Sequence, residues 1–150
     1  MGKRHRGRIL AFQALHAWDT ANDKNSALKD LLDFSWEEKL IPGSGKTDEE
    51  DADFPRLLFA GAAENIMAVD AMIQKHLENW DFSRLTGVDK ALLRLSVYEL
   101  LFKIAPPSVV IDEAVDISKE FGTDDSYRFI NGVLDGVRKT LQSEKENRNE

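Results

Sequence analysis

The amino-acid sequence predicts an all-α protein that folds as one helical bundle. Apolar residues recur at intervals of three and four, which is the period of an α-helix, and no segment shows the alternation typical of a half-buried strand. Prolines, glycines and capping residues end this pattern at short intervals. Short connections make neighbouring helices pack together, so we expect about seven helices in two sub-bundles that share one core. All 150 residues are assigned to this single domain.

The first half of the chain is expected to contain three helices and one long loop. Apolar spacing predicts a helix over residues 4–21, a shorter one over residues 26–36 and a long one over residues 54–80. Residues 39–53 contain a proline, two glycines and then a run of acids, so we interpret them as a solvated loop insertion.

The second half shows clearer helix boundaries. A pattern that resembles a capping box opens a helix over residues 86–103. Two prolines at 106 and 107 then break the chain and preset the next helix, which continues to Phe121. A last helix follows residue 123, and the polar tail after residue 143 is expected to fray.

Composition limits the possible classes of function. The chain has no cysteine and its three histidines show no metal-ligand spacing, so we expect neither a metal site nor a cofactor. No apolar run approaches the roughly 20 residues of a membrane span, so we expect no membrane contact. A net charge of −7 argues against nucleic acid as a partner, but residues 1–18 carry four cations and no acid. A local basic arm on an acidic body can still bind phosphate.

This basic N-terminus is a candidate site for single-stranded RNA. Such RNA is bound by cations that follow the phosphates and by planar groups on which unpaired bases stack, and a guanidinium group can serve both purposes. The alternative is a frayed tail that only adds solubility, and the residues alone leave both interpretations open. The candidate RNA-binding residues here are Lys3, Arg4, His5, Arg6 and Arg8.

The start of the last helix is a second candidate for RNA binding. There Tyr127 can stack on a base, Arg128 can hold a phosphate and Asp125 can accept a hydrogen bond from a base edge. Phe129 completes this group. In the structural alternative, the aspartate complements the helix dipole and Phe129 packs inward.

No catalytic chemistry is expected. Residues 42–47 superficially resemble a phosphate-binding loop, but Leu40 stands where that motif requires a glycine. The acids that follow would also repel a nucleotide. The chain has no cysteine nucleophile and no cofactor-binding βαβ pattern, so we expect a binding protein and not an enzyme.

Three stretches carry a distinctive combination of motifs. They run from Arg4 to Trp18, from Val88 to Leu100, and from Ile111 through Phe-Gly-Thr-Asp-Asp-Ser and Phe-Ile-Asn-Gly-Val-Leu to Asp135. In order and spacing they resemble the NusB family of transcription antitermination factors. The resemblance covers the larger part of the chain and implies a fold of two three-helix bundles.

The resemblance also implies partners. It implies binding of the boxA element of nascent RNA together with NusE, a small-subunit ribosomal protein, within the RNA polymerase antitermination complex, chiefly on ribosomal RNA operons. It places the NusE contact near the helix that starts at residue 86, for which the alternative is a solvated helix face. The partner-binding candidates are His16, which stands where the family usually has tyrosine, and Asp89, Lys90 and Arg94.

The sequence therefore predicts a cytoplasmic RNA-binding adaptor without catalytic activity. We expect its basic N-terminus to lie beside the start of the last helix, so that both form one groove for unpaired ribonucleotides. The alternative function is a helical protein-interaction module that does not contact RNA. The sequence leaves open whether the protein is a monomer or a homodimer that hides its RNA surface.

Overall fold

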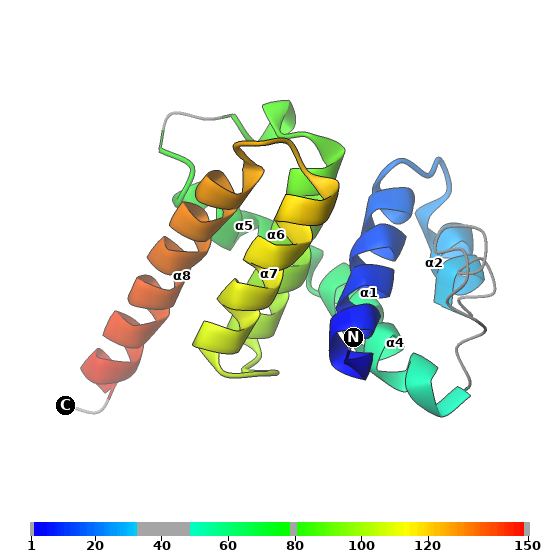
Figure 1. The fold of residues 1–150 in the computed structure, drawn as a ribbon, viewed down its shortest axis with the longest axis horizontal. Helices are drawn as coiled ribbons and strands as arrows, with labels where there is room; N and C mark the ends of the chain where they lie inside the picture. The colour runs from blue at the N-terminus through cyan, green and yellow to red at the C-terminus, as the bar shows by residue number, and fades with distance from the viewer. Residues whose placement is uncertain (1, 33–48, 79–80, 149–150) are drawn as a thin grey trace.

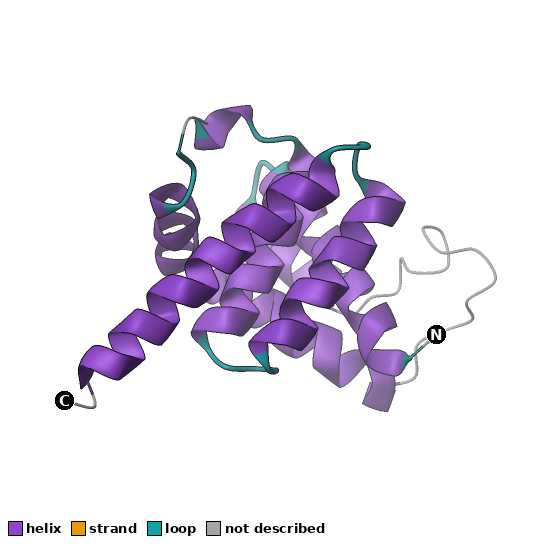
Figure 2. Ribbon diagram, turned by 60° about the vertical axis from the view of Figure 1, so that its left-hand side comes forward, coloured by secondary structure: helices purple, strands orange, loops and turns teal. Residues whose placement is uncertain are grey.

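The computed structural model describes residues 2–32, 49–78 and 81–148, and every regular element in these ranges is a helix (Figures 1 and 2). The predicted all-α bundle of about seven helices is confirmed. A short 3₁₀-helix, η1 (Phe82–Arg84), precedes α6. The α-helices are α1 (Lys3–Asp19), α2 (Lys24–Leu32), α4 (Glu49–Glu64), α5 (Ile66–Lys75), α6 (Gly87–Leu101), α7 (Pro107–Phe121) and α8 (Ser126–Arg148).

The helices form two sub-bundles that meet at α6. One sub-bundle consists of α1, α2 and α4, and the other consists of α5, α6, α7 and α8 (Figure 1). Both α1 and α4 also pack against α6, so one hydrophobic core is continuous through the two sub-bundles. The largest fully buried side chains in this core are Phe59, Leu10, Leu15, Leu58, Ile73, Leu92, Leu93, Leu95, Ile117, Ile130 and Leu134.

The single long helix expected over residues 54–80 is wrong at its centre. The chain bends by 76° between α4 and α5. At this point the side-chain amide of Asn65 donates a 2.8 Å hydrogen bond to the carbonyl of Gly61, and such local bonds compete with the helix ladder. The second sub-bundle therefore has four helices. Among the described residues, no single helix is long and apolar enough to span a membrane, and α4 and α5 together reach that length only across the bend.

The acidic segment is more helical than expected. α4 begins at Glu49, so the last part of the loop predicted over residues 39–53 is helical, while residues 33–48 lie outside the described residues. Carboxylates near a helix N-terminus are stabilised by the positive end of the helix dipole. Acidic composition alone therefore does not distinguish a loop from the start of a helix.

The C-terminal tail also differs from the prediction. We expected fraying after residue 143, but α8 continues to Arg148. Gln142 donates a 3.2 Å hydrogen bond to Glu146 one turn further on. Basic residues in the last turn complement the negative end of the helix dipole.

The predicted starts of α6 and α7 are confirmed. Thr86 is the N-cap of α6, and its hydroxyl accepts a 3.1 Å hydrogen bond from the backbone N–H of Asp89. α7 begins at Pro107, where the missing N–H of proline removes no helical hydrogen bond.

Lys103 closes the C-terminal end of α6 in a left-handed conformation. Its φ is 54°, and no other described non-glycine residue has a positive φ. The N–H of Ile104 then donates a 3.0 Å hydrogen bond to the carbonyl of Glu99, as in a Schellman motif. Glycine usually occupies this position, because a Cβ in the left-handed region costs about 1 kcal/mol.

Replacing Lys103 by glycine is therefore expected to stabilise the protein by about 0.5 kcal/mol or more relative to Lys103→Ala, which keeps the strained Cβ. Urea unfolding of the two variants measures the difference in the free energy of unfolding. A glycine variant less stable than the alanine variant would contradict this interpretation of the helix end.

Candidate functional site

Most of the predicted N-terminal cations lie on the first turn of α1. Lys3 and Arg4 are exposed, and Arg6 is half-buried. The guanidinium carbon of Arg4 lies 4.6 Å from the centroid of the Phe54 ring, on α4. We call Lys3, Arg4 and Arg6, with Phe54 beside them, the basic end. Its exposed cations, Lys3 and Arg4, can follow the phosphates of single-stranded RNA, whereas the half-buried Phe54 ring is already covered by Arg4 and Arg8.

Arg8, which the sequence predicts for RNA binding, does not lie on this surface. Only 3% of its surface is exposed, and its Nε and Nη2 atoms donate to the carboxylate of Glu99 on α6 at distances of 2.9 to 3.2 Å. Glu99 is itself 1% exposed. Arg8 therefore forms a buried ion pair that joins α1 to α6, and it cannot reach a phosphate in solution.

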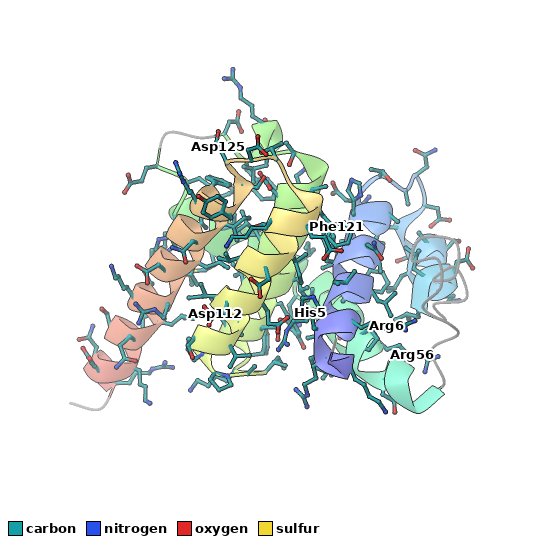
Figure 3. The ribbon with its side chains drawn as sticks, in the orientation of Figure 1. His5, Arg6, Arg56, Asp112, Phe121 and Asp125 are labelled. Carbon is teal, nitrogen blue, oxygen red and sulfur yellow. The ribbon has the colours of Figure 1, made fainter. Side chains whose placement is uncertain are left out.

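His5 is also held by the fold. Its Nδ1 atom lies 2.5 Å from Oε2 of Glu113 on α7, and both side chains are half-buried. The pair links α1 to α7 near the basic end (Figure 3). His5 therefore helps to position the first turn of α1, and its ring is not freely presented to a base.

Two residues near the basic end were missed by sequence reasoning. Phe54 and Arg56 come from α4, which packs against α1 and brings Arg56 to the same side as Arg6 (Figure 3). The one local signal was Gly7, because a Cβ at this position would lie 2.8 Å from the Phe54 ring. A glycine inside a helical pattern indicates a close approach by another segment, but it does not identify that segment.

A cleft of about 220 Å³ lies where η1 and the start of α6 meet the connection between α7 and α8. We call it the α6–α8 corner. Asp125 and Phe129, predicted for RNA, line it together with Asp89, predicted for a partner protein. Asp125 is exposed and Phe129 is half-buried. The other lining residues are Arg84, Leu85, Thr86, Thr123 and Ser126, and of these the sequence reasoning missed the cation Arg84.

Asp89 is the most unusual residue of the corner. It is 8% exposed, and its Oδ1 atom has no hydrogen-bond partner among the described residues. A buried carboxylate oxygen without a donor is costly, and such groups are rare in native structures. This oxygen is enclosed by the protein, and its capacity to accept a hydrogen bond is unmet among the described residues.

His16 lies next to the corner. It is exposed near the end of α1, and its imidazole packs on Gly87 at the start of α6, where a Cβ would overlap the ring. His16, which the sequence predicts for partner binding, is therefore on the surface. It contacts Gly87, and the preceding residue, Thr86, lines the cleft.

Tyr127 and Arg128 lie on the other side of the start of α8. Arg128 Nε donates a 2.9 Å hydrogen bond to the Tyr127 hydroxyl, and the ammonium of Lys119 lies 5.2 Å from the centroid of the Tyr127 ring. Both predicted residues line a shallow groove with Asp112 and Asp116 of α7. These acids weaken the attraction of the groove for phosphate.

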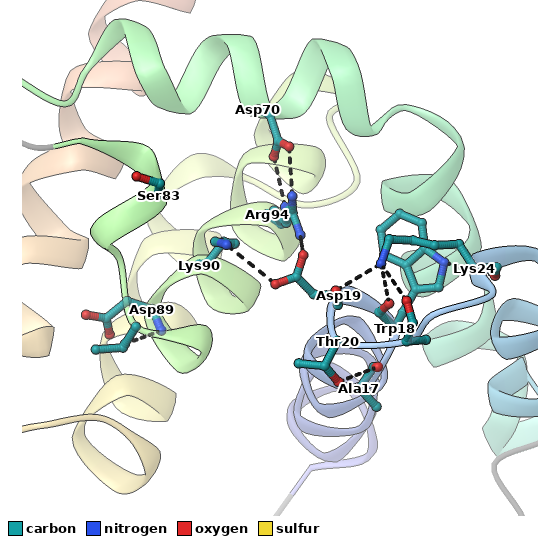
Figure 4. A network of polar contacts seen from close by, with 12 residues as sticks. Ala17, Trp18, Asp19, Thr20, Lys24, Asp70, Ser83, Asp89, Lys90 and Arg94 are labelled. Carbon is teal, nitrogen blue, oxygen red and sulfur yellow. Dashed lines mark hydrogen bonds and ion pairs between the residues drawn. The ribbon is translucent and has the colours of Figure 1, made fainter.

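Arg94, which the sequence predicts for a partner contact, is buried between helices. It is 7% exposed, and its guanidinium donates to Asp70 of α5 at 2.8 and 2.9 Å and to Asp19 of α1 at 2.8 Å (Figure 4). Lys90 is half-buried and lies 3.5 Å from the same Asp19 carboxylate. Arg94 therefore ties three helices together, and Lys90 supports this network.

The ion pairs of Arg94 and Lys90 lower the pKa of the Asp19 carboxyl. Burial alone raises the pKa of this carboxyl, but the hydrogen bond and positive charge of Arg94, together with Lys90, outweigh burial and hold the pKa below the ordinary value for an aspartate. In turn, burial disfavours the charged form of Arg94, while its hydrogen bonds to Asp70 and Asp19 favour that form more strongly and raise the pKa. Both shifts indicate that the ion pairs are retained across the neutral pH range.

The expectation of one groove between the N-terminus and the last helix is wrong. The first turn of α1 lies at one end of the bundle, and α8 begins at the other end (Figures 1 and 3). His5 in the first turn of α1 contacts Glu113 of α7, whereas α8 begins after Phe121, the last residue of α7. Between Glu113 and Phe121, α7 rises about 12 Å. The basic end and the α6–α8 corner are therefore two separate sites.

Comparison with known sequences identifies relatives along almost the whole chain. The sequence model of the NusB family matches residues 5–139. The transcription antitermination protein NusB of Treponema denticola is 50% identical over 136 residues, which cover 90% of this chain and 95% of that protein. The protein of the same name from Treponema pallidum (strain Nichols) is 51% identical over 138 residues, which cover 91% of this chain and 93% of that protein.

Solved structures agree with this relationship. T. maritima NusB superposes with a TM-score of 0.73 at 36% identity, covering 91% of this chain and 90% of that one. A chain in a crystal structure of antitermination factors NusB and NusE in complex with dsRNA superposes with a TM-score of 0.75 at 30% identity, covering 93% of this chain and 98% of that one. Sequence motifs, helical architecture and both comparisons lead to the same conclusion: this chain belongs to the NusB family.

Proposed function

We propose that this protein is a transcription antitermination factor that joins boxA-type single-stranded RNA to the ribosomal protein NusE and thereby supports processive transcription of ribosomal RNA operons. Its relatives carry the name of antitermination proteins, and a homologous structure contains NusB, NusE and RNA. The role needs no catalytic group. It places the protein in the cytoplasm, where the bacteria that carry these relatives make their RNA.

The observation that carries the proposal is the α6–α8 corner. There a buried carboxylate oxygen of Asp89 lacks a donor among the described residues, while the exposed carboxylate of Asp125 and the ring of Phe129 line the same cleft. The exposed carboxylate of Asp125 can accept a hydrogen bond from a partner protein or from the edge of an unpaired base. One cleft thus offers contacts to protein and to RNA, so each is expected to strengthen the binding of the other.

Phosphate is not expected to follow α7 between the two sites. The exposed face of α7 carries Asp112, Asp116 and Glu120, which repel phosphate. α1 has no acidic residue before Asp19, but it is buried between the basic end and His16, where Gln13 alone is half-buried and the other residues are buried. The two sites are therefore proposed as separate contacts for RNA.

RNA binding is tested with Lys3→Ala/Arg4→Ala. Removing two cations from single-strand phosphate contacts is expected to weaken binding of a boxA-type oligonucleotide by about tenfold and to reduce the slope of log affinity against log salt by about 1.4. Fluorescence anisotropy across a salt series measures both quantities. Lys29→Ala, an exposed cation on α2, is the matched control. Unchanged affinity in the double variant would favour an interaction module that does not contact RNA.

The partner contact is tested separately with Asp89→Ala. This variant is expected to weaken NusE binding by about tenfold, while the salt slope for RNA binding by the protein alone stays unchanged. Isothermal titration with purified NusE provides the measurement. Wild-type NusE affinity in Asp89→Ala would remove the corner from the partner interface.

A further inference from the structure

A second groove, of about 750 Å³, lies at the other end of α8 from the corner. It is bounded by the connection between α6 and α7 and by the C-terminal half of α8, which lie near each other in Figure 2. Leu101, Ile104 and Leu141 contribute an aliphatic floor, and Pro106 and Pro107 form one wall. We call this site the α8 groove.

The charge of the α8 groove is opposite to that of the molecule. Its described lining includes four cations and no carboxylate, although the chain as a whole carries −7. Lys103, Lys145 and Arg148 are exposed, and Arg138 is paired with Asp135 at 2.7 Å. The positive field is therefore a local property of this site and not a reflection of overall composition.

The start of α7 adds to this field. Its N-cap, Pro106, makes no side-chain capping hydrogen bond, and the first turn contains no acid. The positive end of the helix dipole is thus not neutralised by a local side chain. Together with Lys103 it favours negative charge along this wall of the groove, while on the opposite wall Lys145 and Arg148 also offset the negative end of the α8 dipole.

We propose that the α8 groove binds an acidic peptide segment with aliphatic side chains, supplied by a partner protein. Carboxylates of the segment pair with the cations, and its leucine or isoleucine side chains bury the floor. RNA fits less well, because none of the described lining residues is aromatic and bases need such platforms for stacking. The site is distant from the α6–α8 corner and does not depend on the proposed function.

Lys103 gives the proposal a sharp test. Its left-handed backbone is strained, so Lys103→Gly removes a groove cation while it relieves a strained helix end. A loss of binding in this variant cannot be attributed to unfolding if its melting temperature is equal to or above that of the wild type.

The experiment uses the full chain and four short fluorescent probes. These are a Glu/Leu peptide, a Glu/Ser peptide, a Lys/Leu peptide and a single-stranded oligouridine. We expect the Glu/Leu peptide to bind at least about tenfold more tightly than either other peptide. Arg148→Glu and Lys103→Gly are each expected to weaken this binding by about fivefold. Lys29→Glu, the matched charge reversal on α2, is expected to leave it unchanged.

Three results would overturn the proposal. The first is the absence of Glu/Leu binding, and the second is binding that persists in both groove variants. The third is oligouridine binding that is stronger than peptide binding and is lost in Lys103→Gly, which would assign the groove to RNA. In every case the Lys3→Ala/Arg4→Ala and Asp89→Ala results on the proposed function would stand.

Discussion

Replacing Glu99 by alanine is expected to lower the free energy of unfolding by about 3–5 kcal/mol. The variant leaves the guanidinium of Arg8 buried in the interface between α1 and α6 without its carboxylate. An unpaired buried charge costs far more than the intact pair contributes. Urea unfolding followed by circular dichroism measures the loss, which is a large fraction of the stability of a typical domain.

The control is a double replacement of the pair by apolar residues, Arg8→Met/Glu99→Leu. Because this variant leaves no buried charge, it is expected to recover most of the stability lost in Glu99→Ala. It also separates structure from function, since a folded protein without Arg8 is expected to bind RNA as the wild type does. If the double variant folds normally but binds RNA much more weakly, Arg8 contributes to the RNA surface after all.

Local signals were sufficient to predict most of the helices. Thr86 and Pro107 start their helices through interactions within one turn, so they can be recognised without knowledge of the tertiary structure. Asn65 ends α4 through a hydrogen bond to Gly61, but asparagine also occurs inside helices. The bend there depends on packing that the sequence pattern does not reveal.

The environment of the charged residues was harder to predict. Arg4 and Arg8 belong to one basic stretch, yet Arg4 is exposed and Arg8 is buried against Glu99, 91 positions away. Nothing near Arg8 in the sequence distinguishes the two. The cations of the α8 groove were missed for the same reason, because they come from two segments that only the fold brings together.

The residues of the α6–α8 corner could be predicted in part. Asp125 and Phe129 were identified from the start of the last helix, and Asp89 from a family resemblance, but their convergence on one cleft is visible only in the structure. The expected neighbour of Asp125, the basic N-terminus, lies at the opposite end of α7. The sequence could predict that these residues lie near the start of a helix, but it could not predict which helix ends lie near each other.

Replacing Arg94 by alanine is expected to destabilise the protein by about 2–4 kcal/mol, because it leaves Asp70 and Asp19 without their shared donor. Arg94→Lys keeps the charge but cannot form the same fork, so an intermediate loss is expected. The stabilisation by Asp19 should be fully present above its unfolded pKa and lost as pH falls through its lower folded pKa. Arg94→Ala is therefore expected to show a smaller stability loss on acidification below about pH 4 than the wild type.

Arg94→Ala is also expected to weaken NusE binding, although Arg94 itself is buried away from the proposed contact. Asp19 anchors the end of α1 to α6, and His16 lies one turn before it, packed on the start of α6 beside the corner. Releasing this end of α1 allows His16 to move relative to Asp89, so NusE affinity should fall by about threefold to tenfold in folded Arg94→Ala and less in Arg94→Lys. Titration with NusE at a temperature where both variants are folded provides the test. Equal NusE affinity in Arg94→Ala and the wild type would show that the corner is held in place without this network.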